Sequence, residues 1–245
     1  MNFSKGFIML PLESEGFGGS ATLYPTLIGD GETAVLIDTG MPGNVERLVE
    51  AIERTGMSMK HLQSVILTHQ DLDHIGCAPD LVEASGGRIQ VLAHAEDVPY
   101  IEGRLPLIKT TPKAMEPMLQ KLPDSVRQDA LRLLENPPKV KVDRTVEDGE
   151  RLPMYGGVRI IHTPGHSAGH ISLYLEQSKT LVAADALMIV RGKLHGPVPH
   201  TSLDIEQAFG SLKKLLELDI ERIICFHGGM LEENCKEQLA ELCRG

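Results

Sequence analysis

The segment Leu67-Thr68-His69-Gln70-Asp71-Leu72-Asp73-His74 follows a short apolar run and places four side chains of metal-binding type, two His and two Asp, within six residues. If residues 65–67 form a buried strand, alternate residues beyond its end can point the same way, with His74 turned beside them. Imidazole nitrogens and carboxylate oxygens at this density suit Zn²⁺ or another first-row divalent ion. The alternative interpretation is a polar loop with solvated carboxylates. Two Asp beside two His directly after an apolar strand favour the metal site.

Three further segments place a ligand-type residue directly after an apolar strand. A loop rich in Gly and Pro at residues 163–170 can present His166, residues 183–184 lead into Asp185, and Phe226 precedes His227. Each segment alone is weak, because a single loop His is more often structural than a ligand. Their shared position at strand ends indicates one common site.

Composition narrows the class of protein. The chain has 245 residues, 42% hydrophobic and 24% charged, with a formal net charge of −10. This is the composition of a globular protein, and the acidic balance argues against a nucleic-acid groove or an anionic membrane surface as the main partner. With no transmembrane run, no secretory signal and no cysteine framework, we expect a cytoplasmic protein that acts on a small molecule. A homodimer is left open.

Hydrophobic periodicity predicts strands and helices in two groups. Strands are expected at 21–28, 34–37, 65–67, 89–93, 158–162, 171–175, 180–184 and 222–225, and helices at 43–52, 204–216 and 232–242. On the helix from Asp204, the apolar face should include Phe209 and Leu212. Strands outnumber helices, which suggests two packed sheets with helices outside.

Residues 97–140 break this pattern. Thr111 resembles a helix N-cap, and Pro123-Asp124 starts a second helix, so a helical hairpin is expected between strands. An insertion of this size is more often a lid or cap than a domain. Met115, Met118 and Tyr100 could then line an apolar pocket, although packing between the cap and the body is the favoured alternative.

The whole set of ligand-type residues resembles the metallo-β-lactamase superfamily, whose signature is HxHxDH followed by a His, an Asp after a strand and a final His. The similarity extends from Leu36-Ile37-Asp38-Thr39-Gly40 to His227 and includes the TPGHSAGHISLY and CFHGG runs. It implies an αββα sandwich of class α+β, with a dinuclear site at one edge of the sheets. It also implies a single domain over 1–245, with the helical cap as an insertion at about 97–140.

Carried over position by position, the resemblance implies two metal ions. The first would be held by His69, Asp71 and His166, and the second by Asp73, His74 and His227, with Asp185 bridging both. Asp38 would support the site without binding metal, although a strand-end Asp capping a turn is an equal alternative. His170 would orient the loop that carries His166.

Two positions depart from the pattern. Asp71 stands where the second His is usual, giving HxDxDH, and Ala184 stands where a Gly usually precedes the bridging Asp. A carboxylate at 71 adds negative charge and a harder donor, which shifts preference from Zn²⁺ toward Fe or Mn. We expect Zn²⁺, with Fe or Mn as alternatives.

The resemblance implies a metal-dependent hydrolase. A metal-bridging hydroxide would attack an ester, lactone, thioester, amide or phosphoester, and Asp73 would carry the proton to the leaving group. The alternatives are an iron-dependent oxidoreductase, either persulfide-dioxygenase-like or diiron, and a non-catalytic metal-binding module. Met188 replaces the Tyr usual in the lactonase branch, which weakens a quorum-lactone assignment.

Substrate contacts are the least determined part of the site. Four polar residues after Asp185 could bind an anionic group, although solvated loop charges are the favoured alternative; they are Arg191, Lys193, His195 and His200. Tyr100 is the remaining candidate, from the cap.

Overall fold

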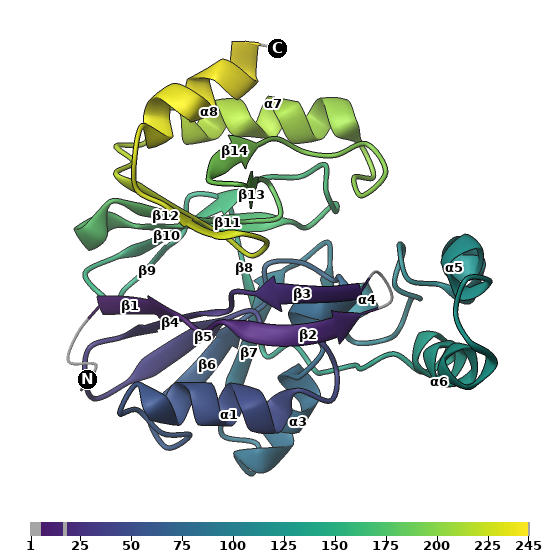
Figure 1. The fold of residues 1–245 in the computed structure, drawn as a ribbon. Coiled ribbons are helices and arrows are strands. Elements are labelled where there is room, and N and C mark those ends of the chain that lie inside the picture. Colours follow the sequence, from purple (N-terminus) through teal and green to yellow (C-terminus); the bar gives the residue numbers. More distant parts are fainter. Residues whose placement is uncertain (1–5, 17–18, 245) are drawn as a thin grey trace.

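Two six-stranded sheets lie face to face, with helices on both outer faces (Figure 1). The computed structural model describes residues 6–16 and 19–244. The first sheet comes from the N-terminal part of the chain and the second from the C-terminal part. This confirms the predicted αββα sandwich.

The first sheet has the order β1-β4-β5-β6-β7-β8, and its strands from β5 to β8 run parallel. Helices α1 and α3 lie in its crossovers and cover its outer face (Figure 1). Because the strands are parallel, the residues that follow β5, β6 and β7 emerge at one edge. The elements are β1 (Gly6–Met9), β4 (Thr26–Gly29), β5 (Ala34–Ile37), α1 (Val45–Arg54), β6 (Leu62–Ile66), α2 (Leu72–Ile75), α3 (Ala78–Ala84), β7 (Gln90–His94) and β8 (Arg144–Val146).

The second sheet has the order β16-β15-β12-β11-β10-β9, and β12 runs parallel to β15. Helices α7 and α8 cover its outer face (Figure 1). Its elements are β9 (Arg151–Leu152), β10 (Val158–His162), β11 (Ile171–Leu175), β12 (Thr180–Ala184), α7 (Ile205–Leu215), β15 (Arg222–Cys225), β16 (Gly229–Leu231) and α8 (Cys235–Arg244). Two hairpins stand beside the sheets: β2 (Leu12–Gly16) with β3 (Gly19–Leu23), and β13 (Met188–Val190) with β14 (Lys193–His195).

The two sheets share one apolar core. Ile37 and Ile66 from the first sheet pack with Ile160 and Leu173 from the second, and all four are buried. Separate apolar clusters lie between each sheet and its own helices. Burial on both sides explains why the central strands read as continuous apolar runs rather than alternating ones.

The expected strand at 21–28 is two strands. β3 ends at Leu23 and pairs with β2, whereas β4 begins at Thr26 in the first sheet. Pro25 lies between them, and without an N–H it cannot donate to a strand ladder. Alternation of apolar residues continues across Pro25, so the pattern alone did not reveal the division.

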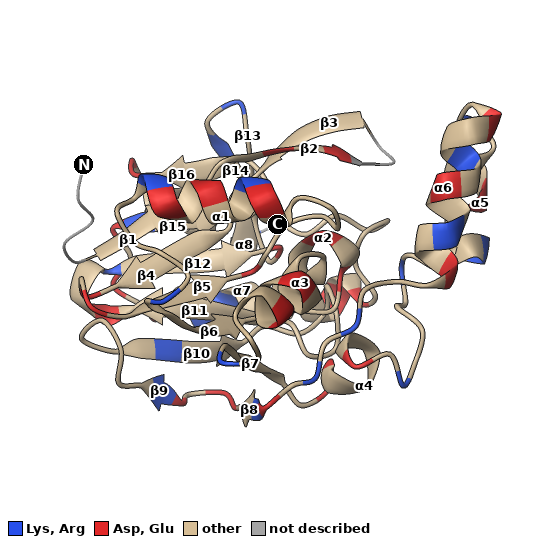
Figure 2. Ribbon diagram, turned by 90° about the horizontal axis from the view of Figure 1, so that it is seen from below, with Lys and Arg blue, Asp and Glu red and all other residues tan. Residues whose placement is uncertain are grey.

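Residues 97–140 contain α4 (Val98–Ile101), α5 (Pro112–Leu119) and α6 (Asp124–Glu135). Thr111 caps α5 as expected, its hydroxyl accepting a hydrogen bond from the Ala114 amide at 3.2 Å. The α5–α6 hairpin stands away from both sheets (Figures 1 and 2) and packs around its own small cluster. That cluster is Leu119, Ala130 and Leu134, with Met115, Leu122 and Leu131 against it.

Charged residues are spread over the outer helices. Figure 2 shows acidic and basic residues interleaved along the ribbons of α1 and α6. Among the described residues, no helix is both long enough and apolar enough to cross a membrane.

Helix α7 buries a narrower face than its apolar pattern indicates. Leu212 is fully buried, whereas Phe209 is 38% exposed and lies beside Gly196. The prediction that Phe209 belongs to the buried face is therefore wrong. At 100° per residue, Phe209 is turned away from the stripe formed by Ala208, Leu212 and Leu215.

Leu212→Ala should lower the free energy of unfolding by about 2–5 kcal/mol, because it leaves a cavity under the second sheet. Phe209→Ala is the matched control on the same helix and should cost clearly less. Chemical denaturation of both variants measures the difference. Equal losses would contradict the assignment of the buried face.

Candidate metal centre

The segment 67–74 turns from strand to helix at the edge of the first sheet. β6 ends at Ile66, and Asp71 takes an extended conformation (φ −64°, ψ 145°) as the N-cap of α2. Asp73 and His74 then lie in the first turn of that helix. The short helix brings both into the same region as His69, which precedes it.

The second sheet brings its ligand-type residues to the same edge. His166 lies in the loop between β10 and β11, Asp185 follows β12, and His227 follows β15. Gly165, at φ +127°, is needed here because a Cβ would lie 2.2 Å from the backbone nitrogen of Ala208. The loop that carries His166 therefore packs directly on the start of α7.

Two groups of potential metal ligands result. The first contains His69, Asp71, His166 and Asp185, and the second contains Asp73, His74 and His227. In the first group, Asp71 Oδ2 lies 3.3 Å from His69 Nε2 and 3.0 Å from His166 Nε2. In the second, Asp73 Oδ2 lies 3.2 Å from His227 Nε2.

Asp185 lies between the two groups. Its Oδ1 is 3.3 Å from His74 Nε2, and its Oδ2 is 3.5 Å from both His166 Nε2 and His227 Nε2. The structure thus brings together all seven residues that the resemblance assigned to metal. Their roles as ligands, and that of Asp185 as a bridge, stay predictions.

The donor atoms fit divalent ions. Among the described residues, His69 Nε2, His74 Nε2 and Asp185 Oδ1 are buried and make no well-aligned hydrogen bond, although His74 Nε2 and Asp185 Oδ1 lie only 3.3 Å apart. An unpaired buried polar atom is costly, and three of them facing one another indicate a missing positive partner. Imidazole and carboxylate donors are the ligands expected for Zn²⁺, Fe or Mn.

Asp38 orients the imidazole of His74 through the Nδ1 side of the ring. Its Oδ2 lies 2.8 Å from His74 Nδ1, and it also accepts hydrogen bonds from the Thr68 amide and hydroxyl at 2.8 and 2.7 Å. With Nδ1 bonded to this carboxylate, His74 directs Nε2 toward the second group. Asp38 belongs to neither group of ligands.

His170 performs a related task from the second sheet. Its Nδ1 lies 2.9 Å from the Thr163 hydroxyl, and its Nε2 accepts a hydrogen bond from the Asp185 amide at 3.2 Å. His170 is completely buried, and burial holds its pKa well below the usual range, so it stays neutral. It therefore fixes the backbone of Asp185.

Charges in the site compensate one another. Burial would raise the pKa of Asp185, but His227 and His74 hold it well below its usual value. Burial likewise opposes the charged form of His227, yet the carboxylates of Asp185 and Asp73 raise its pKa to about 10. Without metal, protons on these imidazoles supply the positive charge that the carboxylates require.

Asp97 was not singled out from the sequence, although it joins the two halves of the site. Its buried carboxylate accepts hydrogen bonds from the Gln70 amide at 2.9 Å, the Ser167 hydroxyl at 2.7 Å and the Gly169 amide at 2.9 Å. These contacts tie the loop of His69 to the loop of His166. Its position shortly after the apolar strand β7 was the signal that could have revealed it.

Lys109 is the second residue that the sequence did not reveal. It belongs to the insertion, and its ammonium reaches the first group, 2.5 Å from Asp71 Oδ2. Nothing in the local sequence around Lys109 marks it, because the contact depends on how the insertion folds back.

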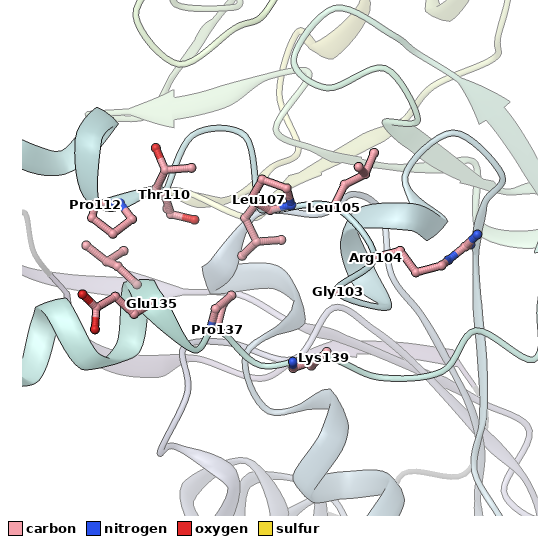
Figure 3. A pocket seen from close by; sticks show the side chains of 12 residues that line it. Gly103, Arg104, Leu105, Leu107, Thr110, Pro112, Glu135, Pro137 and Lys139 are labelled. Carbon is pink, nitrogen blue, oxygen red and sulfur yellow. The ribbon is translucent and has the colours of Figure 1, made fainter.

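Two cavities of about 230 Å³ open beside the site. One is lined by His166, Asp185 and His227 together with Met188, Pro197 and Val198. The other is lined by Asp73, His227 and residues of the β2–β3 hairpin. A separate cavity of about 360 Å³ at the base of the insertion, shown in Figure 3, has none of the seven candidate ligands in its wall.

The candidate substrate contacts are not brought to these cavities. Arg191, at the tip of the β13–β14 hairpin, is exposed, as are Lys193, His195 and His200. Tyr100 in α4 packs against the core between the first sheet and its helices. None of the five lines either cavity at the site.

Comparison with known proteins agrees with this architecture. The model of the metallo-beta-lactamase superfamily matches residues 24–227, and the chain belongs to that superfamily. The protein named "Probable metallo-hydrolase YflN" of Bacillus subtilis (strain 168) is 30% identical over 96% of this chain and 84% of its own length.

Solved structures share the fold. The metallo-beta-lactamase family protein TTHA1429 of Thermus thermophilus has a TM-score of 0.70 and 21% identity, covering 98% of this chain and 78% of that chain. TTHA1623, solved in a di-iron-bound form, has a TM-score of 0.64 and 27% identity, covering 94% of this chain and 97% of that chain.

Asp38→Asn should weaken metal binding about 10- to 100-fold, because an amide cannot hold His74 Nδ1–H and the Thr68 donors as a carboxylate does. Competition with a chromophoric chelator measures the affinity. Asp80→Asn, at an exposed position on α3, is the matched control. Unchanged affinity in Asp38→Asn would show that Asp38 only caps a turn.

The metal-free protein should lose stability as pH rises from 6.5 toward 10. The pKa of His227 is raised from 6.5 to about 10. The stability that its protonated imidazole adds to the folded state is therefore complete below pH 6.5 and is lost as pH rises through about 10. Thermal unfolding between pH 6.5 and 9 measures the slope. His227→Gln should reduce this slope and exposed His195→Gln should not; a flat wild-type profile would contradict the prediction.

Proposed function

We propose that the chain is a dinuclear metal-dependent hydrolase that cleaves an ester, lactone, thioester, amide or phosphoester bond of a small molecule. The observation that carries the proposal is the pair of ligand groups, joined by Asp185 and holding three buried donor atoms without a well-aligned hydrogen bond. The name of the relative from Bacillus subtilis, a metallo-hydrolase, points to the same reaction class. We propose Zn²⁺ as the metal at both positions.

Two divalent ions bound by these groups would supply Lewis acidity and a water of lowered pKa, near 7. The chain contributes the arrangement around them. Asp38 and His170 fix His74 and Asp185, and Asp97 fixes the two loops relative to each other. Such preorganisation lowers the reorganisation needed when charge develops on the substrate.

Asp73 is the proposed proton carrier. Its side chain is 26% exposed and lines the cavity beneath the β2–β3 hairpin, whereas Asp71 and Asp185 are more enclosed. Asp73 Oδ2 lies 3.2 Å from His227 Nε2, which stabilises the charged form of the Asp73 carboxylate before it accepts a proton. From this position it can hand the proton to a leaving group in the same cavity.

The cavity beside His166 and Asp185 favours a substrate with a small apolar group next to the reacting bond. Its wall is built by Leu187, Met188, Pro197 and Val198. A volume of about 230 Å³ is below the usual range for drug-sized ligands, so only part of a substrate fits there.

An iron-dependent oxidoreductase is the second candidate. The observations in its favour are the Asp71 carboxylate among the ligands and the di-iron form of a structure that is 27% identical. Harder oxygen donors favour such an ion over Zn²⁺.

The test begins with metal content by mass spectrometry, on protein purified without added metal, followed by assays on generic esters, lactones, thioesters and phosphoesters. We expect close to two Zn per chain and a hydrolytic rate that chelation abolishes. Asp73→Asn should lower kcat about 10²- to 10⁴-fold, with Asp80→Asn as the control.

Metal content is measured for each variant, so that loss of the ion is distinguished from loss of the proton carrier. Iron as the main metal, with oxygen consumption and no hydrolysis, would replace the hydrolase by the oxidoreductase. Full hydrolytic activity in the chelated protein would overturn both.

A further inference from the structure

The ammonium group of Lys109 contacts two candidate ligand atoms of the first group. Its Nζ lies 2.5 Å from Asp71 Oδ2 and 2.7 Å from His166 Nε2, and it donates to the Thr201 carbonyl at 3.0 Å. The Lys109 side chain is 18% exposed, so these contacts are shielded from water.

The loop around Lys109 is held against the metal-binding segment. Leu107 is buried, and the Ile108 amide donates to Gln70 Oε1 at 3.0 Å, between His69 and Asp71. The same loop lines the cavity at the base of the insertion (Figure 3). Lys109 is therefore brought to the site by backbone and core contacts, and not only by its own charge.

The contact between Lys109 and His166 occupies the nitrogen through which His166 would bind a metal. His166 Nε2 lies within hydrogen-bond distance of both Lys109 Nζ and Asp71 Oδ2, and whether it accepts from the first or donates to the second, it cannot bind a metal at the same time. Asp71 Oδ2 is shared in the same way, and two cations on these atoms would also repel each other.

The second group carries no such competitor. Among the described residues, the ion pairs of Asp73, His74 and His227 involve only each other, Asp185 and Asp38. No Lys or Arg side chain of the described part of the chain forms an ion pair with them. The two groups therefore differ in how freely a metal can enter.

We propose that Lys109 competes with the metal of the first group for Asp71 and His166, so that the second group fills first and binds more tightly. The inference rests on the two ligand groups of the proposed function. It assigns Lys109 a positioning role: it neutralises Asp71 until a metal displaces its ammonium. It also gives the extra carboxylate of HxDxDH a partner within the chain.

The test is a titration of the metal-free protein with Zn²⁺ against a chromophoric chelator, without substrate. Wild type should show two unequal sites, the weaker lost in His166→Ala and the tighter in His227→Ala. Lys109→Met should strengthen the weaker site about 10- to 100-fold, the equivalent of one hydrogen bond to a charged group, and leave the tighter one unchanged. Lys109→Arg should restore the wild-type inequality, because it keeps a cation there.

Lys113→Met, in the same insertion and away from both ligand groups, is the matched control and should change neither site. A weaker site that is unchanged or further weakened in Lys109→Met would overturn the proposal. Because binding is measured without turnover, a failure of the hydrolase assays would not affect this result.

A measurement on the wild type avoids dependence on how the variants fold. Imidazole ¹⁵N NMR with half an equivalent of Zn²⁺ should show His74 and His227 shifting before His69 and His166. The opposite order, or simultaneous shifts, would overturn the proposal.

Discussion

Holding three partly buried carboxylates among four imidazoles at one sheet edge is the constraint on which the architecture depends. Isolated, each buried charge would cost several kcal/mol, so the groups are stable only as a set. Asp185 is central to that set because it contacts three of the imidazoles, from both ligand groups. The fold meets this constraint by ending β6, β12 and β15 at the same edge, where loops replace the apolar strands.

The surrounding contacts set the orientation of these groups. Asp38, His170 and Asp97 contact none of the atoms that face the two groups. They hold the ring of His74 through its Nδ1, and the backbone or side chains of the segments that carry His69, His166 and Asp185. Asp38 itself takes φ +59°, and Ala184 takes φ +47° immediately before Asp185. Left-handed backbone at residues with a Cβ is strained, and it persists where neighbouring contacts fix the chain. The resemblance to the family predicts a Gly at position 184, which would relieve that strain, so Ala184 is tolerated there rather than favourable.

Most of the sandwich could be predicted from the sequence, because buried strands and amphipathic helices leave local patterns. The strands at 158–162, 171–175, 180–184 and 222–225 lie where periodicity placed them, and Thr111 caps its helix. The ligand clusters were equally visible, since each follows an apolar run. Phe209 was predicted to be buried because apolar character alone does not tell how far around the helix the buried face extends. Asp97 and Lys109 act through contacts across 27 to 92 positions of chain, and such contacts leave no local periodicity.

In the segment between β7 and β8, the loop before α5 contacts the candidate metal site, whereas the α5–α6 hairpin does not cover it. A helical hairpin of this length suggests a lid, yet neither cavity at the site is lined by residues of α5 or α6. What reaches the site is the loop before α5, through Lys109 and the Ile108 amide. Burial would raise the pKa of Asp71, but Lys109 and His69 hold it well below the usual range, so the carboxylate that replaces the usual His stays charged. The negative charge of Asp71 is thus matched by a cation from the loop before α5, and the two features are best understood as one.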